Sequence, residues 1–392
     1  MKKYLNLLIT LLVIVLMIST FYIQKVIANS EAIMLKTTVG DEVELKNVVI
    51  DFSMWNRDLY KSVRLEEGDL YVMENLSVLS RLSGAEYSPE IKNLLKNQRS
   101  FLRTKDLSNA NYFEDERYLA YVGFEYNPEV IIENKGTPNQ VEHHYYSYDF
   151  VIDILEKDTN KRWSYTVDGP NDIDISFIGI EDVQILGEEL KVLAQFYTWE
   201  TPKHYQWLTF KMANGEISDS KLIMFENESD EGPRLLNDIN NLKPEQYYIF
   251  SSGPETVDES GNIVPSETLY VFNLKTEQME EIQIDVEKLG YFVSVEQSNI
   301  FFAQREDGLT INAYNIENGT VETMAFPEIK SNDDIIFAQL KRGKLYTAFH
   351  DENSNQINIC IADVDTGDLI YEGYLKHELQ DVEMYISSLK VF

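Results

Sequence analysis

Histidine is the side chain most often used as a metal ligand and general base, and it occurs five times in this sequence. His143 and His144 are adjacent, His204 follows 60 residues later, and His350 and His377 lie in the last third of the chain. If His144 and His204 stand at equivalent places in neighbouring repeats, their imidazoles could converge on a metal ion. We favour unrelated histidines at strand ends and predict no metal site.

Common catalytic motifs are also missing from the sequence. It contains no His-Glu-x-x-His zinc motif, no G-x-S-x-G turn for a nucleophilic serine and no Gly-rich phosphate loop. The single cysteine, Cys360, lies in the apolar run 358–362. One cysteine excludes an intrachain disulfide, and this setting predicts a small buried hydrophobe. We therefore predict no catalytic residues and no cofactor, and lean towards a protein that is not an enzyme.

Carboxylates are too numerous, at 66 Asp and Glu, to identify an acid/base pair. Asp172 and Asp174, like Asp363 and Asp365, match the first half of a calcium-binding loop. Neither pair continues into the Gly and terminal Glu that complete such a loop. A hairpin turn explains the second pair better.

Aromatic residues are concentrated in two segments, 145–150 and 196–207. Such side chains could stack on a sugar ring or anchor a peptide. The alternation of Tyr146, Tyr148 and Phe150 instead indicates a strand with one face in the core. We favour the core, and the binding residues stay unknown.

Short alternating or continuous apolar runs dominate the chain after residue 33, and Gly, Asn, Asp and Pro clusters separate them. Representative runs are 69–73, 118–122, 190–196 and 344–349. They have strand length and are rich in β-branched and aromatic residues. The sequence therefore predicts an all-β protein.

A repeated hairpin refines this prediction. Its turn residue, which needs a positive φ, falls at positions 160, 215, 277, 319 and 367, in steps of 55, 62, 42 and 48. A period near 40–50 residues is typical of four-stranded propeller blades. We predict a single β-propeller of about seven four-stranded blades over residues 29–392; the alternative is β-sandwich domains.

The best copy of the hairpin is 363–370, Asp-Val-Asp-Thr-Gly-Asp-Leu-Ile. It resembles the D-x-x-T-G hairpins of bacterial quinoprotein-like and WD40-like propeller repeat proteins. The Trp common in quinoprotein repeats is absent, since Tyr371 and Glu372 stand there, and no adjacent cysteine pair exists. The resemblance implies a fold and no quinone cofactor.

One segment, near 88–105, has helical periodicity. Ser88 and Pro89 are a typical N-cap and first helical residue. Ile91, Leu94 and Phe101 share one face, and basic residues fill the rest. A helical insertion packed on the β-domain is favoured over a helix that binds a partner or a surface.

The N-terminus is a membrane signal. Lys2 and Lys3 precede an uncharged, mostly apolar run at 5–23, long enough for a helix to cross a bilayer. We expect residues 1–28 to be a single-pass signal-anchor with a cytoplasmic N-terminus, and the bulk of the chain to be extracellular. Secretion after cleavage near Ala28 is the alternative.

The net charge of −32 argues against nucleic acid, because the protein's own field repels polyphosphate. The sequence thus predicts a membrane-tethered, extracytoplasmic β-propeller that binds a ligand or protein as a sensor or scaffold. The membrane is one expected partner, and an envelope protein or glycan another. The alternative function is an envelope hydrolase or lyase with carboxylates at the mouth of the propeller channel.

Overall fold

The apolar runs form antiparallel β-strands. The computed structural model describes residues 33–56, 59–76, 87–133, 141–169, 175–198, 204–225, 232–237, 242–252, 255–257, 263–265, 268–282, 284, 286–305, 308–329, 336–351, 354–377 and 382–392. These residues form six antiparallel sheets of four or five strands and one two-stranded sheet. The chain divides into two units, unit 1 with Met1–Glu86 and Leu289–Phe392, and unit 2 with Tyr87–Lys288.

Unit 2 contains, in its described residues, three four-stranded sheets built from strands in chain order. The first consists of β5 (Tyr112–Glu114), β6 (Tyr118–Glu133), β7 (Val141–Glu156) and β8 (Lys161–Asp168). The second consists of β9 (Ile175–Leu186), β10 (Glu189–Thr198), β11 (His204–Lys211) and β12 (Ile217–Ile223). The third consists of β13 (Arg234–Leu235), β14 (Tyr247–Ser252), β17 (Thr268–Asn273) and β18 (Gln278–Ile282), with the hairpin of β15 (Glu255–Val257) and β16 (Ile263–Pro265) between β14 and β17.

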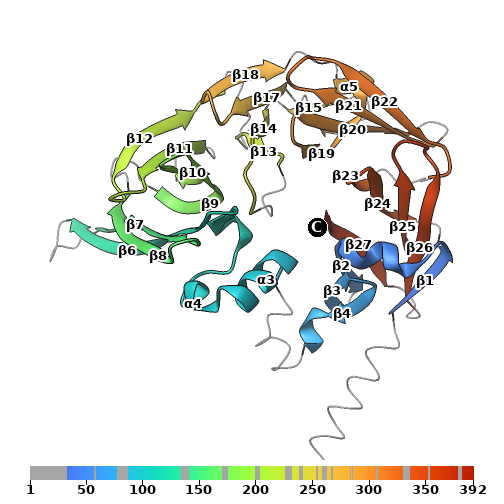
Figure 1. Ribbon diagram of the computed structural model, residues 1–392, viewed down its shortest axis with the longest axis horizontal. Helices are drawn as coiled ribbons and strands as arrows, with labels where there is room; N and C mark the ends of the chain where they lie inside the picture. Colours follow the sequence, from blue (N-terminus) through green and yellow to red (C-terminus); the bar gives the residue numbers. More distant parts are fainter. Residues whose placement is uncertain are drawn as a thin grey trace, which may run out of the picture. The chain divides into compact units, whose positions relative to one another are not determined.

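Unit 1 joins strands from both ends of the described chain. Its first sheet consists of β19 (Tyr291–Glu296), β20 (Asn299–Arg305), β21 (Leu309–Asn315) and β22 (Val321–Phe326). The second consists of β23 (Ile336–Lys341), β24 (Lys344–Asp351), β25 (Gln356–Asp363) and β26 (Leu369–His377), with β1 (Ile33–Val39) as fifth strand beside β26 (Figure 1). The third consists of β27 (Glu383–Val391), β2 (Val48–Asn56), β3 (Leu59–Glu66) and β4 (Asp69–Val72).

Helices are few and short in the described residues. The α-helices are α3 (Pro89–Asn97), α4 (Arg99–Leu102) and α5 (Val286–Leu289), and the 3-10 helices are η1 (Glu42–Asn47), η2 (Met73–Asn75) and η3 (Asn109–Asn111). None of these helices is long and apolar enough to cross a membrane. Residues 1–28, to which the anchor prediction applies, lie outside the described part of the chain.

Within each unit the middle sheet is buried on both faces. On β24, Leu345 and Phe349 pack into the core shared with β19–β22, whereas Tyr346 and Ala348 pack into the core shared with β27 and β2–β4. Burial on both faces explains why this strand reads as a continuous apolar run. Three sheets stacked in this way match propeller blades better than a sandwich, in which each sheet has one inner face.

The predicted hairpin register is confirmed. Asn160, Gly215, Glu277, Gly319 and Gly367 all have a positive φ, between 55° and 74°. Each turn joins the third and fourth strands of its own sheet, so the five positions are equivalent in five successive sheets.

Side chains reinforce the last three of these turns. The side-chain oxygen of Asn273, Asn315 or Asp363 accepts two backbone N–H bonds from its own turn, at 2.9–3.2 Å. Four residues later, the N–H of the positive-φ residue donates to the carbonyl of the same Asn or Asp. This geometry accounts for the Asp and Gly of the D-x-x-T-G pattern, and confirms that Asp363 serves a turn.

The predicted number of blades was too high. The described residues form six large sheets, three in each unit, instead of about seven. The prediction assumed about 50 residues per blade, but β6 and β7 each have 16 residues. The helical segment before β5 lengthens its repeat further.

The predicted helical insertion forms α3 and α4 and packs on the first sheet of unit 2. Ser88 caps α3 by accepting the Ile91 N–H at 3.2 Å. Ile91, Leu94, Phe101 and Leu102 are buried against residues of β5 and β6. The insertion therefore belongs to the core of this unit, as the favoured interpretation predicted.

Candidate functional site

Unit 1 contains a pocket of about 370 Å³ between the sheets β19–β22 and β23–β26. It lies where the core shared by these sheets meets the hairpin turns at one edge. Buried Phe301, Ala313 and Leu340 line it together with half-buried Met324 and Val364. This volume is within the range of small-molecule sites, roughly 300–1,000 Å³.

Polar groups surround this apolar lining. Asn315 Nδ2 donates to Asn299 Oδ1 at 3.0 Å. Since Asn315 Oδ1 accepts two backbone bonds of its own turn, the orientation of this amide is fixed. Thr320 Oγ1 donates to Asn318 Oδ1 at 2.6 Å beside them. The pocket thus offers fixed hydrogen-bonding groups next to apolar surface.

Charged residues complete the pocket. Glu296, at the end of β19, is half-buried, and burial raises the pKa of its carboxyl although Lys341 opposes the shift. Lys341 donates through Nζ to the carbonyl of Val391 at 2.6 Å. Glu322, on β22, is exposed. The formal charge of these three lining residues is −1.

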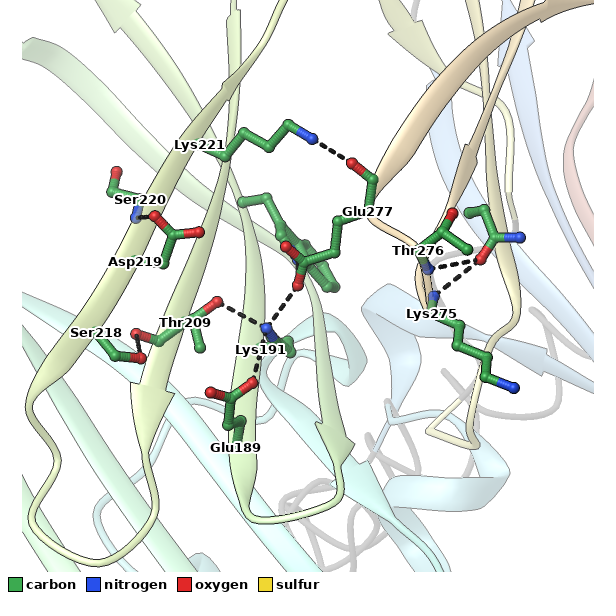
Figure 2. Close-up of polar contacts among 12 residues, drawn as sticks. Glu189, Lys191, Thr209, Ser218, Asp219, Ser220, Lys221, Lys275, Thr276 and Glu277 are labelled. Atoms are coloured by element: carbon green, nitrogen blue, oxygen red, sulfur yellow. Dashed lines mark hydrogen bonds and ion pairs between the residues drawn. The ribbon is translucent and has the colours of Figure 1, made fainter.

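A second polar cluster lies between the second and third sheets of unit 2. Lys191 on β10 is 8% exposed, and its Nζ lies 2.6 Å from Glu277 Oε1, 3.0 Å from Glu189 Oε2 and 2.9 Å from Thr209 Oγ1 (Figure 2). Trp207 Nε1 donates to the same Glu277 oxygen at 3.2 Å. The cluster therefore links the turn before β18 to strands β10 and β11.

Electrostatics in this cluster favour a fixed ion pair over catalysis. Burial acts to lower the pKa of Lys191, but hydrogen bonds to Glu277 and Glu189 outweigh it, so the pKa is raised. Burial likewise acts to raise the pKa of Glu277, and Lys191 and Trp207 lower it on balance. Both groups are held in their charged forms, and a lysine so protonated is a poor nucleophile or base.

We predict a defined order of stability for variants of Glu277. Glu277→Gln should lower the free energy of unfolding by about 1.5 kcal/mol, because it removes the charge facing buried Lys191. Glu277→Ala should cost more. Glu277→Gly should cost about 0.5–1 kcal/mol less than Glu277→Ala, because Glu277 adopts φ 55°, a conformation that glycine reaches without strain.

Urea denaturation measures this order, and Glu317→Gln is the control. Glu317 is an exposed acid in the equivalent hairpin before β22, so its variant should change stability by less than about 0.5 kcal/mol. Equal losses of stability for Glu277→Gln and Glu317→Gln would show that the ion pair of Lys191 with Glu277 does not stabilise the fold.

A third feature is the fully buried carboxyl of Asp182 on β9. Burial raises its pKa to about 7, against hydrogen bonds from Tyr248 and Gln184. Tyr248 Oη and Gln184 Nε2 both donate to Asp182 Oδ2, at 2.6 and 2.7 Å. A pKa near neutrality is typical of catalytic acids. This carboxyl, however, is enclosed between two sheets and bonded to its neighbours, so it is not presented to a substrate.

The structure does not place His144 and His204 at equivalent positions, as the metal hypothesis required. His144 and His204 fall on the third strands of successive sheets, but 16 and 11 residues before their turn positions, so they are not equivalent. The side chains of His143 and His144 lie outside the described residues, and the His204 ring stacks on Phe196 with centroids 5.7 Å apart. His350 and His377 bond within unit 1, to Asn355 Oδ1 and the Val382 carbonyl. The described residues contain no group of three or more His, Cys, Asp or Glu arranged for a metal ion.

Five of the six described aromatic residues of the two segments are core residues, as predicted, and the sixth, Tyr197, is half-buried. Tyr148, Phe150 and Phe196 are buried between the first and second sheets of unit 2, and Tyr205 and Trp207 between the second and third. The side chains of Tyr145, Tyr146 and Trp199 lie outside the described residues, as do Asp172 and Asp174.

Cys360 is also as predicted. Its side chain is buried in the core between the first two sheets of unit 1, and burial raises the pKa of its thiol to about 12. A thiol with this pKa is inert at neutral pH.

The residues around the pocket were missed as a site. The sequence identified position 319 as a turn residue, and nothing in the pattern placed Glu296 or Leu340 beside it. In the sequence, only the asparagines at the ends of β20 and β21 could have indicated this site.

Comparisons with known proteins give no family. No protein-family model matches the chain, and no curated protein matches its sequence. Among solved structures, Porphyromonas gingivalis dipeptidyl peptidase 4 is 12% identical, with a TM-score of 0.37 over 68% of this chain and 36% of that one. The β-propeller domain of the Pyrococcus furiosus trilobed protease is 10% identical, with a TM-score of 0.31 over 66% and 82%. Acinetobacter baumannii TolB is 11% identical, with a TM-score of 0.25 over 87% and 83%.

These likenesses concern the fold and assign no activity. The chain spans about a third of the length of the dipeptidyl peptidase and 45% of a Bacteroides ovatus structure described as a putative dipeptidyl aminopeptidase IV. The fold-level resemblance to propeller repeat proteins rests on the stacked four-stranded sheets and their equivalent hairpins.

Proposed function

We propose that this protein is a non-enzymatic ligand-binding module of β-propeller type, held on the outer side of a membrane by residues 1–28. The observation that carries the binding role is the pocket between β19–β22 and β23–β26. It combines apolar surface with oriented amides and a half-buried carboxylate. Small-molecule sites commonly have this composition.

The rigidity of the surroundings supports this role. The pocket lies between two sheets that share a packed core, and backbone-bonded Asn and Asp side chains fix the turns beside it. A site on fixed elements loses little conformational entropy when a ligand binds. A sensor or scaffold in the envelope would profit from such a preformed site.

Blocking the pocket tests the binding role. Thr320→Trp places a large side chain at an exposed lining position, so it should fill the opening while the core stays intact. We expect ligands identified by thermal-shift screening of the full-length protein to lose at least tenfold in affinity for this variant. Unchanged affinities, with an unchanged melting temperature, would exclude the pocket as the site.

The tether rests on the apolar run 5–23 and the preceding Lys2 and Lys3. Alkaline phosphatase fused after Phe392 should be active, since that enzyme needs an exported location, and should stay with the membrane after carbonate washing. Deleting residues 5–23 should abolish phosphatase activity. Active phosphatase in the medium, on a chain starting near Asn29, would support secretion, and an inactive full-length fusion would contradict export.

A further inference from the structure

The proposed pocket has an unusual charge distribution. The carboxylate of Glu296 is half-buried, and burial raises its pKa against the opposing charge of Lys341. Removing a carboxylate from water is costly. The structure therefore retains a desolvated negative group at the edge of a cavity.

One cation of the pocket opposes this negative charge. Lys341 lines the same pocket and lowers the pKa of Glu296, but less strongly than burial raises it. Its ammonium donates to the carbonyl of Val391 on β27. Glu322 adds a second carboxylate from the opposite edge of the same sheet. An anionic ligand would meet both acids.

The remaining lining suits an aliphatic group. Phe301 and Leu340 are 6% and 7% exposed, and Met324 lies beside them on the same core. Asn299, the first residue of β20, and Asn315, the last residue of β21, also line the pocket. A methylene chain could contact the apolar side chains while its charged end reaches a carboxylate, which is how lysine and arginine side chains are commonly accommodated.

We propose that this pocket binds a primary ammonium or guanidinium group on a short aliphatic stem, with Glu296 as its counter-ion. The stem lies against Phe301, Leu340 and Met324, and Glu322 adds a weaker, solvent-screened attraction. The inference rests on the proposed ligand-binding role of the same pocket. The ligand is either a free amine or a basic side chain of a peptide, since both present the same chemistry.

Calorimetric titration of the full-length protein at 0.15 M salt tests the inference. Cadaverine and agmatine represent free amines, and acetyl-Gly-Lys-Gly-amide represents a basic side chain. We expect at least one of them to bind with unit stoichiometry. Glu296→Gln should weaken that binding at least tenfold, Glu322→Gln less, and Glu317→Gln, a surface acid outside the pocket, not at all. Tighter binding of the peptide than of the amines would identify a protein partner, and the reverse a small molecule.

Two neutral probes and an anion separate this inference from the proposed function. 1-Pentanol, glucose and pentanoate lack the cation. Binding of one of them that Thr320→Trp abolishes, without binding of any amine, would overturn the cation specificity and leave the ligand-binding role standing. Amine binding that Glu296→Gln leaves unchanged would also overturn the inference. No binding of any probe to the wild-type protein would count against both.

Discussion

Asp153→Asn should lower the free energy of unfolding by about 3 kcal/mol, because it strands a buried cation. Asp153 on β7 lies 2.6 Å from Lys105 Nζ and 2.9 Å from Arg162 Nη2, and it also accepts a bond from Ser164. The Lys105 and Asp153 side chains are only 6% and 10% exposed. The same lysine ammonium lies 4.5 Å from the centre of the Phe101 ring, so the pair fastens the helical insertion to its sheet.

Three further variants make this result specific. Arg162 is 44% exposed, so Arg162→Gln should cost less than about 1 kcal/mol. Lys105→Met should also cost less than Asp153→Asn, since Asp153 keeps Arg162 as partner. Asp158→Asn removes an exposed charge from the following turn and should be neutral. Urea denaturation followed by tryptophan fluorescence measures the free energies of unfolding. A loss for Asp153→Asn no larger than that for Asp158→Asn would disprove that the ion pair holds the helical insertion on its sheet.

Asp153 also makes a contribution to stability that depends on pH. Burial acts to raise its pKa, but bonds from Arg162, Lys105 and Ser164 outweigh it, so the pKa is lowered from 3.8. A carboxyl of lowered pKa stabilises the fold above its unfolded pKa, and that stabilisation disappears as the pH falls through the folded value.

The second large effect concerns Asp182, whose contribution to stability changes with pH in the opposite direction. Its pKa rises from 3.8 to about 7 on folding, so between these values the folded protein keeps a proton that the unfolded chain releases. Its contribution is fully present below pH 3.8 and is lost as the pH rises through about 7. Relative to Asp182→Asn, the wild-type protein should therefore lose stability between pH 4 and pH 8, by up to about 4 kcal/mol at ~1.4 kcal/mol per pKa unit.

Urea titrations of both proteins across this range measure the difference. Tyr248→Phe sharpens the test: the Tyr248 hydroxyl bond lowers the pKa of Asp182, so its loss should move the transition to higher pH. Carboxyl carbon NMR of Asp182 should show the same displacement. A wild-type to Asp182→Asn difference that stays constant from pH 4 to pH 8 would contradict the raised pKa.

Local geometry explains which parts of the fold were predictable. The hairpins were found because a tight turn needs a residue with positive φ, and this requirement is written in neighbouring residues. The turn residue has a positive φ even at position 277, where Glu stands in place of Gly or Asn. Ser88 and Pro89 identified the start of α3 because helix capping also depends on neighbouring residues.

Contacts between distant residues explain what was not predictable. Lys191 and Glu277 are 86 positions apart, and Asp182 and Tyr248 are 66 apart. Lys191 reads as one polar residue in a strand, and only the stacking of a second sheet buries it. The pocket likewise depends on how the sheets β19–β22 and β23–β26 pack together. The residues next to Glu296 or Leu340 in the sequence do not indicate this packing.

The strands at the two ends of unit 1 set an order of assembly during synthesis. β1 pairs only with β26, and β2 takes its other neighbour from β27, across about 334 positions of sequence. The edges of β1 and β2 that face β26 and β27 therefore stay unpaired until those strands have been synthesised, whereas each four-stranded sheet of unit 2 can form from hairpins that follow one another in the chain. Deleting residues 383–392, which include β27, would leave β2 as an unpaired edge strand and promote self-association.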